Sequence, residues 1–202
     1  MTTEDWKGIN IKGGKLIINN PTFNIGVNPI SPNDLPSVDT KIRSVSPAKP
    51  IEVLYCCSDS KKDEEMRQNL EKHLKILQRQ GVITTWDKGM IGAGKEWESE
   101  TNKQLMTADI ILLLISVDFI ASNWCWDVEV KSAMERHEAK QARVIPVILR
   151  RTDDWENNTP FRKLKPLPKD GKPVSEWGNR DKAFCNIAEG IRAAVDELTA
   201  SV

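Results

Sequence analysis

The sequence predicts an α/β domain built on a mostly parallel sheet with helices on both faces. Short apolar runs of strand length alternate with segments of helical spacing between residues 51 and 198. The run Ile110–Ile115 is apolar throughout, as expected for a strand that helices cover on both sides. Repeated strand–helix alternation requires right-handed crossovers, which place consecutive strands parallel in one sheet.

The individual elements follow from local patterns. Met66, Leu70, Leu74 and Leu77 recur at the spacing of a helix face, and Gly81 then ends that helix. The predicted elements, in chain order, are a strand at 51–56, this first helix, a strand at 82–86, a Gly-rich loop at 87–96, a helix at 97–106, the central strand at 110–115, a helix at 122–139, a strand at 143–149 and a C-terminal helix marked by apolar residues from 184 to 198.

The chain divides into three predicted regions. Residues 1–26 form a short N-terminal β unit, because apolar pairs in strand alternation recur every seven residues at Ile9/Ile11, Leu16/Ile18 and Phe23/Ile25. Such short strands bury little surface alone, so this unit is expected to pack on the main domain or on a neighbouring molecule. Residues 27–50 are rich in proline and serine and suit an extended linker. Residues 51–202 form the main domain.

Composition excludes several classes of function. Lys plus Arg and Asp plus Glu both number 29, so no net charge attracts nucleic acid or an anionic membrane. The longest apolar run is too short to span a membrane, and the N-terminus lacks the apolar core of a secretory signal. We therefore expect a cytoplasmic protein. Its four cysteines have no metal-type spacing, which predicts reduced thiols and no metal site.

The polar segments after the strands are the expected place for a site, because ligands of parallel α/β sheets bind at the carboxyl ends of strands. These segments are 57–60, the loop 87–96, and 116–129. Gly89 to Lys95 has the spacing of a phosphate-binding loop, but Glu96 stands where a magnesium-binding Ser or Thr is needed. We interpret the loop as a mobile binding loop with glycine hinges.

The histidines and cysteines give little support for a hydrolase with a nucleophilic Ser or Cys. His73 and His137 both fall on predicted helices among charged residues, where solvent-exposed helix faces account for them. Cys125, near the predicted site, is the one candidate thiol nucleophile.

The segment from Ser116 to Glu129 carries a resemblance to a known family. Its Ser116, Phe119, Ser122, Trp124-Cys125 and Glu129 resemble the corresponding stretch of Toll/interleukin-1 receptor (TIR) domains, in the form common in bacterial proteins. Further matching features, in the same order, are Trp86-Asp-Lys-Gly, Ile91-Gly-x-Gly, Ala108-Asp109, Val144–Leu149 and Asp154-Trp155. The resemblance covers about residues 51–198 and implies a flavodoxin-like sheet of five parallel strands.

The resemblance also implies an activity. Many TIR domains cleave NAD at the nicotinamide–ribose bond, and their essential carboxylate corresponds to Glu129 in this chain. In the plant pattern the Glu follows the Trp by four residues, whereas Glu129 follows Trp124 by five, so we expect the helix to begin one residue later here. Asp127 is the alternative acid.

Around Glu129, seven residues are predicted to bind the substrate. NAD is expected as a substrate and not as a cofactor, and no other cofactor is implied. Ribose, phosphate or ring contacts are assigned to Ser58, Asp59, Gly92, Lys95, Trp97, Ser122 and Trp124.

The predicted function is a TIR enzyme that hydrolyses or cyclises NAD in immune, anti-phage or cell-death signalling. It is expected to act as an oligomer formed through TIR contacts and the N-terminal β unit. The alternative is a non-catalytic TIR interaction module for signalling assembly. A phosphate-receiving regulator is disfavoured because Ser116, and not an Asp, ends the central strand.

Overall fold

The computed structural model describes residues 10–12, 15–17 and 49–200. The chain divides into two compact units, Met1–Val45 and Ser46–Val202. In the first, strand β1 (Asn10–Lys12) pairs antiparallel with β2 (Lys15–Ile17), and these strands overlap the first two predicted apolar pairs. The third predicted pair, Phe23/Ile25, and the predicted linker through residue 48 lie outside the described residues.

The second unit confirms the predicted α/β fold with a parallel sheet. Its strands are β3 (Ile51–Cys56), β4 (Ile83–Trp86), β5 (Ile110–Ile115) and β6 (Arg143–Ile148). They lie in the order β4-β3-β5-β6, and every neighbouring pair is parallel. All six residues of β5 are buried, as its uninterrupted apolar sequence predicts.

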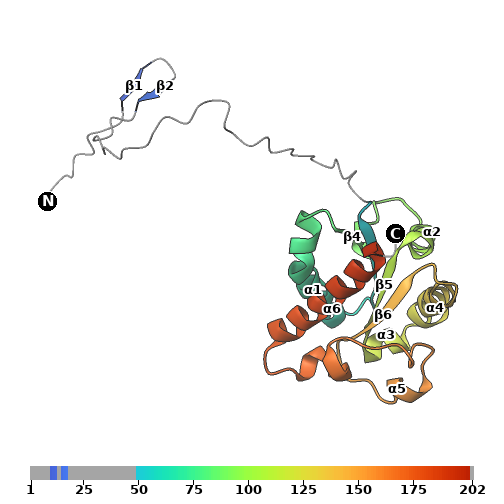
Figure 1. The fold of residues 1–202 in the computed structure, drawn as a ribbon. Coiled ribbons are helices and arrows are strands. Elements are labelled where there is room, and N and C mark those ends of the chain that lie inside the picture. Colours follow the sequence, from blue (N-terminus) through green and yellow to red (C-terminus); the bar gives the residue numbers. More distant parts are fainter. Residues whose placement is uncertain (1–9, 13–14, 18–48, 201–202) are drawn as a thin grey trace. The chain divides into compact units, whose positions relative to one another are not determined.

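Helices cover the sheet on both faces (Figure 1). Helices α1 (Lys61–Arg79) and α6 (Arg180–Ala200) pack side by side on the face that receives Val53 and Tyr55 of β3. The opposite face receives Leu54 and Cys56, because successive strand side chains point to opposite sides. The elements on or near that face are α2 (Trp97–Thr107), α3 (Val117–Ala121), the π-helix η2 (Trp124–Val130), α4 (Lys131–Glu138) and α5 (Trp155–Asn158).

The predicted fifth strand is not formed among the described residues, so the expectation of five strands is wrong. Beyond β6 in the sequence, Leu167 makes a single parallel bridge to Val147. The Leu167 amide donates to the Pro146 carbonyl at 2.8 Å, and its carbonyl accepts from the Ile148 amide at 2.7 Å. Pro166 and Pro168 flank Leu167 and have no backbone N–H to donate, so the pairing does not extend along the edge.

Among the residues the structure describes, none of the helices has the length and apolar character needed to cross a bilayer.

Candidate active site

The carboxyl ends of all four strands bring polar side chains to one edge of the sheet. Ser58 follows β3, Lys88 follows β4 in the short 3-10 turn η1 (Lys88–Met90), Ser116 follows β5 and Arg150 follows β6. Parallel strands end at the same edge, so residues distant in sequence meet there. The sequence predicts the site at this edge, and two of the polar residues there, Ser58 and Ser116, are buried.

One part of this edge is held together by Asp63, in the first turn of α1. Asp63 is fully buried and accepts hydrogen bonds from the hydroxyls of Ser58 and Ser116. The Arg150 guanidinium donates to its other oxygen at 2.8 Å and also pairs with Asp118. Because a buried carboxylate is costly without such partners, this network fixes the ends of β3, β5 and β6 relative to α1. Ser58, predicted to contact substrate, is already engaged in it.

Glu129 lies in η2, where the chain follows a π-helix and not the predicted α-helix. A π-helix closes its hydrogen bonds over five residues in place of four. Residues five apart, such as Trp124 and Glu129, therefore come to the same side, and the Trp124 indole nitrogen lies 3.3 Å from Glu129 Oε1. The wider turn accommodates the additional residue between Trp and Glu. The expectation that the helix simply begins one residue later is replaced by this local change of helix type.

The Glu129 carboxylate is buried, and its two oxygens differ in their contacts. Its side chain is 1% exposed, and Lys88 Nζ lies 3.1 Å from Oε1. Oε2 is buried and has no hydrogen-bond partner among the described residues. Burial raises the pKa of Glu129, an effect that the Lys88 charge and hydrogen bonding from Lys88, Cys125 and Trp124 partly oppose. Although burial lowers the pKa of Lys88, the negative charge of Glu129 raises it to a net value above the ordinary range.

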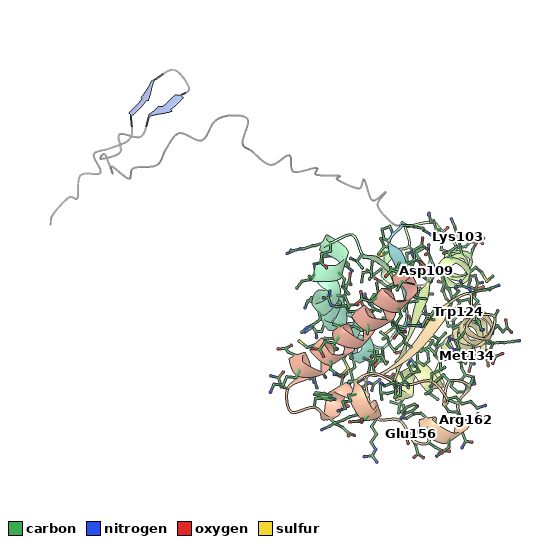
Figure 2. All side chains as sticks on the ribbon, in the orientation of Figure 1. Lys103, Asp109, Trp124, Met134, Glu156 and Arg162 are labelled. Atoms are coloured by element: carbon green, nitrogen blue, oxygen red, sulfur yellow. The ribbon has the colours of Figure 1, made fainter. Side chains whose placement is uncertain are left out.

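Two tryptophans form the wall beside this ion pair. Trp124, labelled in Figure 2, packs edge-on against Trp97 with ring centroids 4.4 Å apart and an interplanar angle of 60°. Lys88 Nζ lies 6.0 Å from the centre of the Trp97 ring, within range of a cation–π attraction. Trp97 keeps 45% of its surface exposed. It is therefore the outer member of the pair and the one available to an incoming aromatic ring.

A cavity of 210 Å³ adjoins the ion pair on the side of β3 and β4. Two predicted binding residues, Ser58 and Asp59, line it together with Lys88. The rest of its lining includes Tyr55 and Arg67, and the Arg67 guanidinium pairs with Asp87 at 3.1 Å. Lys88 thus connects the cavity to Glu129.

The other predicted residues either bond the backbone or are exposed. The Ser122 hydroxyl accepts from the Cys125 amide at 3.3 Å and so stabilises the start of η2. Gly92 and Lys95 are exposed on the loop 87–96, and Lys95 pairs with Glu100 at 3.3 Å. Asp127, the alternative acid, is also exposed.

Lys88 is the main residue that the sequence reasoning missed. The loop holds two lysines, and the sequence analysis assigns a substrate contact to Lys95 and none to Lys88. The available signal was the position of Lys88 two residues after the end of β4, at the carboxyl end of a strand, within Trp86-Asp-Lys-Gly.

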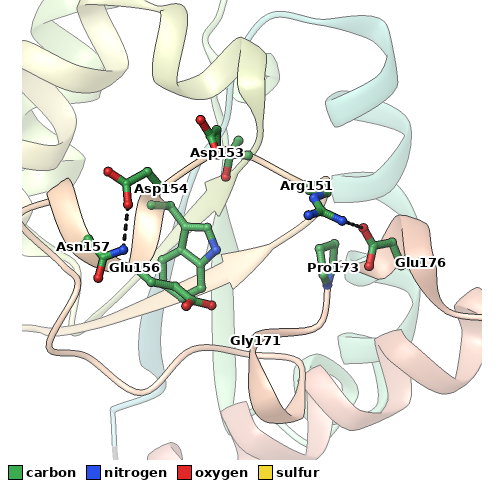
Figure 3. A pocket seen from close by; sticks show the side chains of 10 residues that line it. Arg151, Asp153, Asp154, Glu156, Asn157, Gly171, Pro173 and Glu176 are labelled. Atoms are coloured by element: carbon green, nitrogen blue, oxygen red, sulfur yellow. Dashed lines mark hydrogen bonds and ion pairs between the residues drawn. The ribbon is translucent and has the colours of Figure 1, made fainter.

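A second hollow, of 400 Å³, lies around residues 151–157 and contains none of the predicted site residues (Figure 3). Arg151 approaches Glu176 at 3.8 Å and Asn157 donates to Asp154 at 2.6 Å, whereas the buried Thr152 hydroxyl has no hydrogen-bond partner among the described residues. No group of three or more His, Cys, Asp or Glu side chains within residues 49–200, or in the short β1–β2 pair, is placed to hold a metal ion.

Comparisons with known proteins agree with the resemblance in the site segment. A family model described as TIR domain matches residues 56–179. An uncharacterized protein of Sinorhizobium fredii, y4lF, is 48% identical over 142 residues, which are 70% of this chain and 43% of that protein. The chain thus spans less than half the length of this relative.

Two solved structures are more distant. The TIR domain of the Toll-related receptor TRR-2 from Hydra magnipapillata is 17% identical, with a TM-score of 0.39 over 53% of this chain and 78% of that one. The TIR domains of the activated Roq1 resistosome are 19% identical, with a TM-score of 0.41 over 69% of this chain and 84% of theirs. The family model, which matches more than half of the chain, carries the assignment: this chain belongs to the TIR domain family.

Proposed function

We propose that this TIR domain is an NAD nucleosidase in which Glu129 is the catalytic carboxylate. The observation that carries the proposal is the buried Glu129 Oε2, which has no partner among the described residues, at the carboxyl end of the sheet. An unsatisfied buried carboxylate oxygen is costly, and such costs are typical of functional sites. A ribose hydroxyl of NAD would supply the missing hydrogen-bond donor.

A single carboxylate is sufficient for this chemistry. Most glycosidases need a second acid to protonate a poor leaving group. The nicotinamide of NAD leaves as a neutral base from a cationic ring, so its departure needs no proton. An ionised Glu129 would stabilise the positive charge that develops on the ribose as the glycosidic bond breaks. Electrostatic groups of this kind typically contribute about 3 to 4 kcal/mol to the transition state.

The neighbouring groups suit the rest of the dinucleotide. Trp97 presents a partly exposed ring for stacking on nicotinamide or adenine, and Ser58 and Asp59 line the adjoining cavity. Lys88 is a cation within reach of both the cavity and Glu129, so it suits a diphosphate oxygen once a substrate occupies the cavity. Since Glu129 is enclosed, Lys88 and Trp97 must shift when the ribose enters.

The test is nicotinamide release from NAD by the purified full chain over a series of protein concentrations. Glu129→Gln should lower the rate by about 10² to 10³-fold, the equivalent of a lost electrostatic group. The matched control is Asp127→Asn, an exposed carboxylate two residues away, which should retain the wild-type rate. A rate that rises more steeply than protein concentration would support an oligomeric enzyme. Equal rates for wild type and Glu129→Gln would contradict the proposal.

A second candidate function is a non-catalytic interaction module. It is favoured by the same ion pair, because a carboxylate that is 1% exposed and partnered by a lysine also suits a purely structural role. This candidate predicts concentration-dependent oligomers with no nicotinamide release at any concentration. It also predicts that Gly92 substitutions in the exposed loop weaken the oligomers.

A further inference from the structure

A cysteine, a histidine and an aspartate meet on the pair α1 and α6, on the sheet face opposite to η2. Asp181 and Cys185 are four residues apart on α6 and therefore share one side of that helix. His73 comes from α1. Its Nδ1 lies 3.6 Å from Cys185 Sγ, and its Nε2 lies 3.6 Å from Asp181 Oδ1.

The imidazole of His73 is held with one nitrogen facing each partner. The Phe184 ring stacks on it, with centroids 5.6 Å apart and an interplanar angle of 29°, and Phe184 itself is buried. The Asp181 carboxylate can only accept a hydrogen at neutral pH, so it favours the tautomer with the proton on Nε2. Nδ1 then presents its lone pair to the Cys185 thiol. A thiol beside an oriented base is the arrangement of an activated nucleophile.

Cys185 is also the accessible thiol of the chain. The other three cysteines, Cys56, Cys57 and Cys125, are buried, and no disulfide links any of the four. Burial raises the pKa of Cys125 to about 12 and holds the pKa values of Cys56 and Cys57 well above the ordinary range. A reagent that reacts with thiolates should therefore react with Cys185 first.

We propose that Cys185 is a covalent modification site for small, neutral α,β-unsaturated carbonyl compounds, with His73 as the base and Asp181 as a positioning residue. In the reaction, Sγ forms a bond to the β-carbon and the carbon–carbon double bond becomes single. The thiol proton passes to His73 Nδ1 and then to the α-carbon. This addition has no leaving group and needs no oxidant. It therefore suits a surface site that has a base but no further groups to stabilise an anionic leaving group.

N-ethylmaleimide, a reagent of this class, provides the test on the full chain. At limiting reagent and pH 7, peptide mass spectrometry should find Cys185 modified first, and Cys185→Ser should remove this rapid phase. His73→Gln should slow the reaction by about 3- to 30-fold. The upper figure follows from the roughly 3% of thiolate that an unassisted thiol carries at pH 7. Lys75→Gln, an exposed change on the same helix, is the matched control and should react like wild type.

Two further measurements separate base assistance from altered packing. At pH 9.5 thiols in water ionise without help, so the difference between wild type and His73→Gln should fall below about twofold. Asp181→Asn, on a side chain that is 85% exposed and therefore dispensable for folding, should slow the reaction at pH 7 by about twofold. The proposal is overturned if His73→Gln reacts at the wild-type rate at pH 7, if its slowing is unchanged at pH 9.5, or if a buried cysteine reacts before Cys185.

Discussion

The ion pair between Lys88 and Glu129 makes a prediction that does not depend on catalysis. We consider Lys88→Met, which keeps an unbranched side chain one atom shorter beside Trp97 and removes its charge. At 3.1 Å and an effective dielectric constant of about 20, the gross attraction is about 5 kcal/mol. Lys88 loses hydration on pairing and keeps 21% of its side chain exposed, so part of the attraction is cancelled. We expect the free energy of unfolding to fall by about 1 to 3 kcal/mol at pH 8.

The pH dependence of this loss has a definite sign. Burial raises the pKa of Glu129 above that of the unfolded chain, so its contribution favours the fold at low pH and is lost as the pH rises through the folded-state pKa. Without Lys88, burial of the charged Glu129 carboxylate costs still more free energy. The difference between wild type and Lys88→Met should therefore be smallest at acidic pH, where protonation removes the charge of Glu129, and should grow as the pH rises.

The assay is urea unfolding followed by circular dichroism at a series of pH values. Lys95→Met is the matched control, because this exposed lysine of the same loop should change stability by less than about 0.5 kcal/mol at any pH. The double variant Lys88→Met/Glu129→Gln should be more stable than the sum of the single changes predicts. A pH-independent loss, or equal effects of Lys88→Met and Lys95→Met, would refute the reasoning.

Two further predictions concern the frame around the site. Asp63→Asn should lower the free energy of unfolding by about 2 to 4 kcal/mol in urea titration, because it leaves Arg150 without its buried partner. The control is Asp59→Asn at an exposed neighbouring position, which should change this free energy by less than about 0.5 kcal/mol. Similar losses for both variants would contradict a stabilising role of the Asp63 network. Gly171→Ala should cost about 1 to 3 kcal/mol, since Gly171 has a φ of 65° and a Cβ there would lie 3.3 Å from Trp155. Gly178→Ala, in open space, is its control, and equal melting temperatures for the two variants would contradict the prediction.

The fold was largely predictable because its signals are local. The apolar run of β5 and the helical spacing in α1 each lie within one continuous segment. The prediction of a fifth strand was wrong because the formation of that strand depends on single residues at a sheet edge. Pro166 and Pro168 flank Leu167 and stop a ladder that the resemblance implied.

The site was predictable in position but not in its pairings. The rule that ligands bind at strand carboxyl ends located it, and the resemblance supplied Glu129. Neither reveals that Lys88 reaches Glu129 across the sheet edge. His73 was expected on a solvent-exposed helix face, whereas it is half-buried against Phe184 and faces a thiol 112 residues away in the chain. Partnerships of this kind are set by packing and carry no local pattern.

The π-helical turn of η2 has a consequence for how this segment tolerates insertions and deletions. An additional residue in an α-helix rotates every later side chain by about 100°, which would turn the buried face of the following helix toward water. In this chain the surplus residue is confined to Trp124–Val130, and α4 keeps Ala133 and Arg136 buried. Removing one residue from η2 would tighten that turn and leave α4 in phase, whereas the same deletion in α1 would displace its apolar face from the sheet. A change in the number of residues between Trp124 and Glu129 is therefore accommodated within η2, and Glu129 remains at the edge of the sheet.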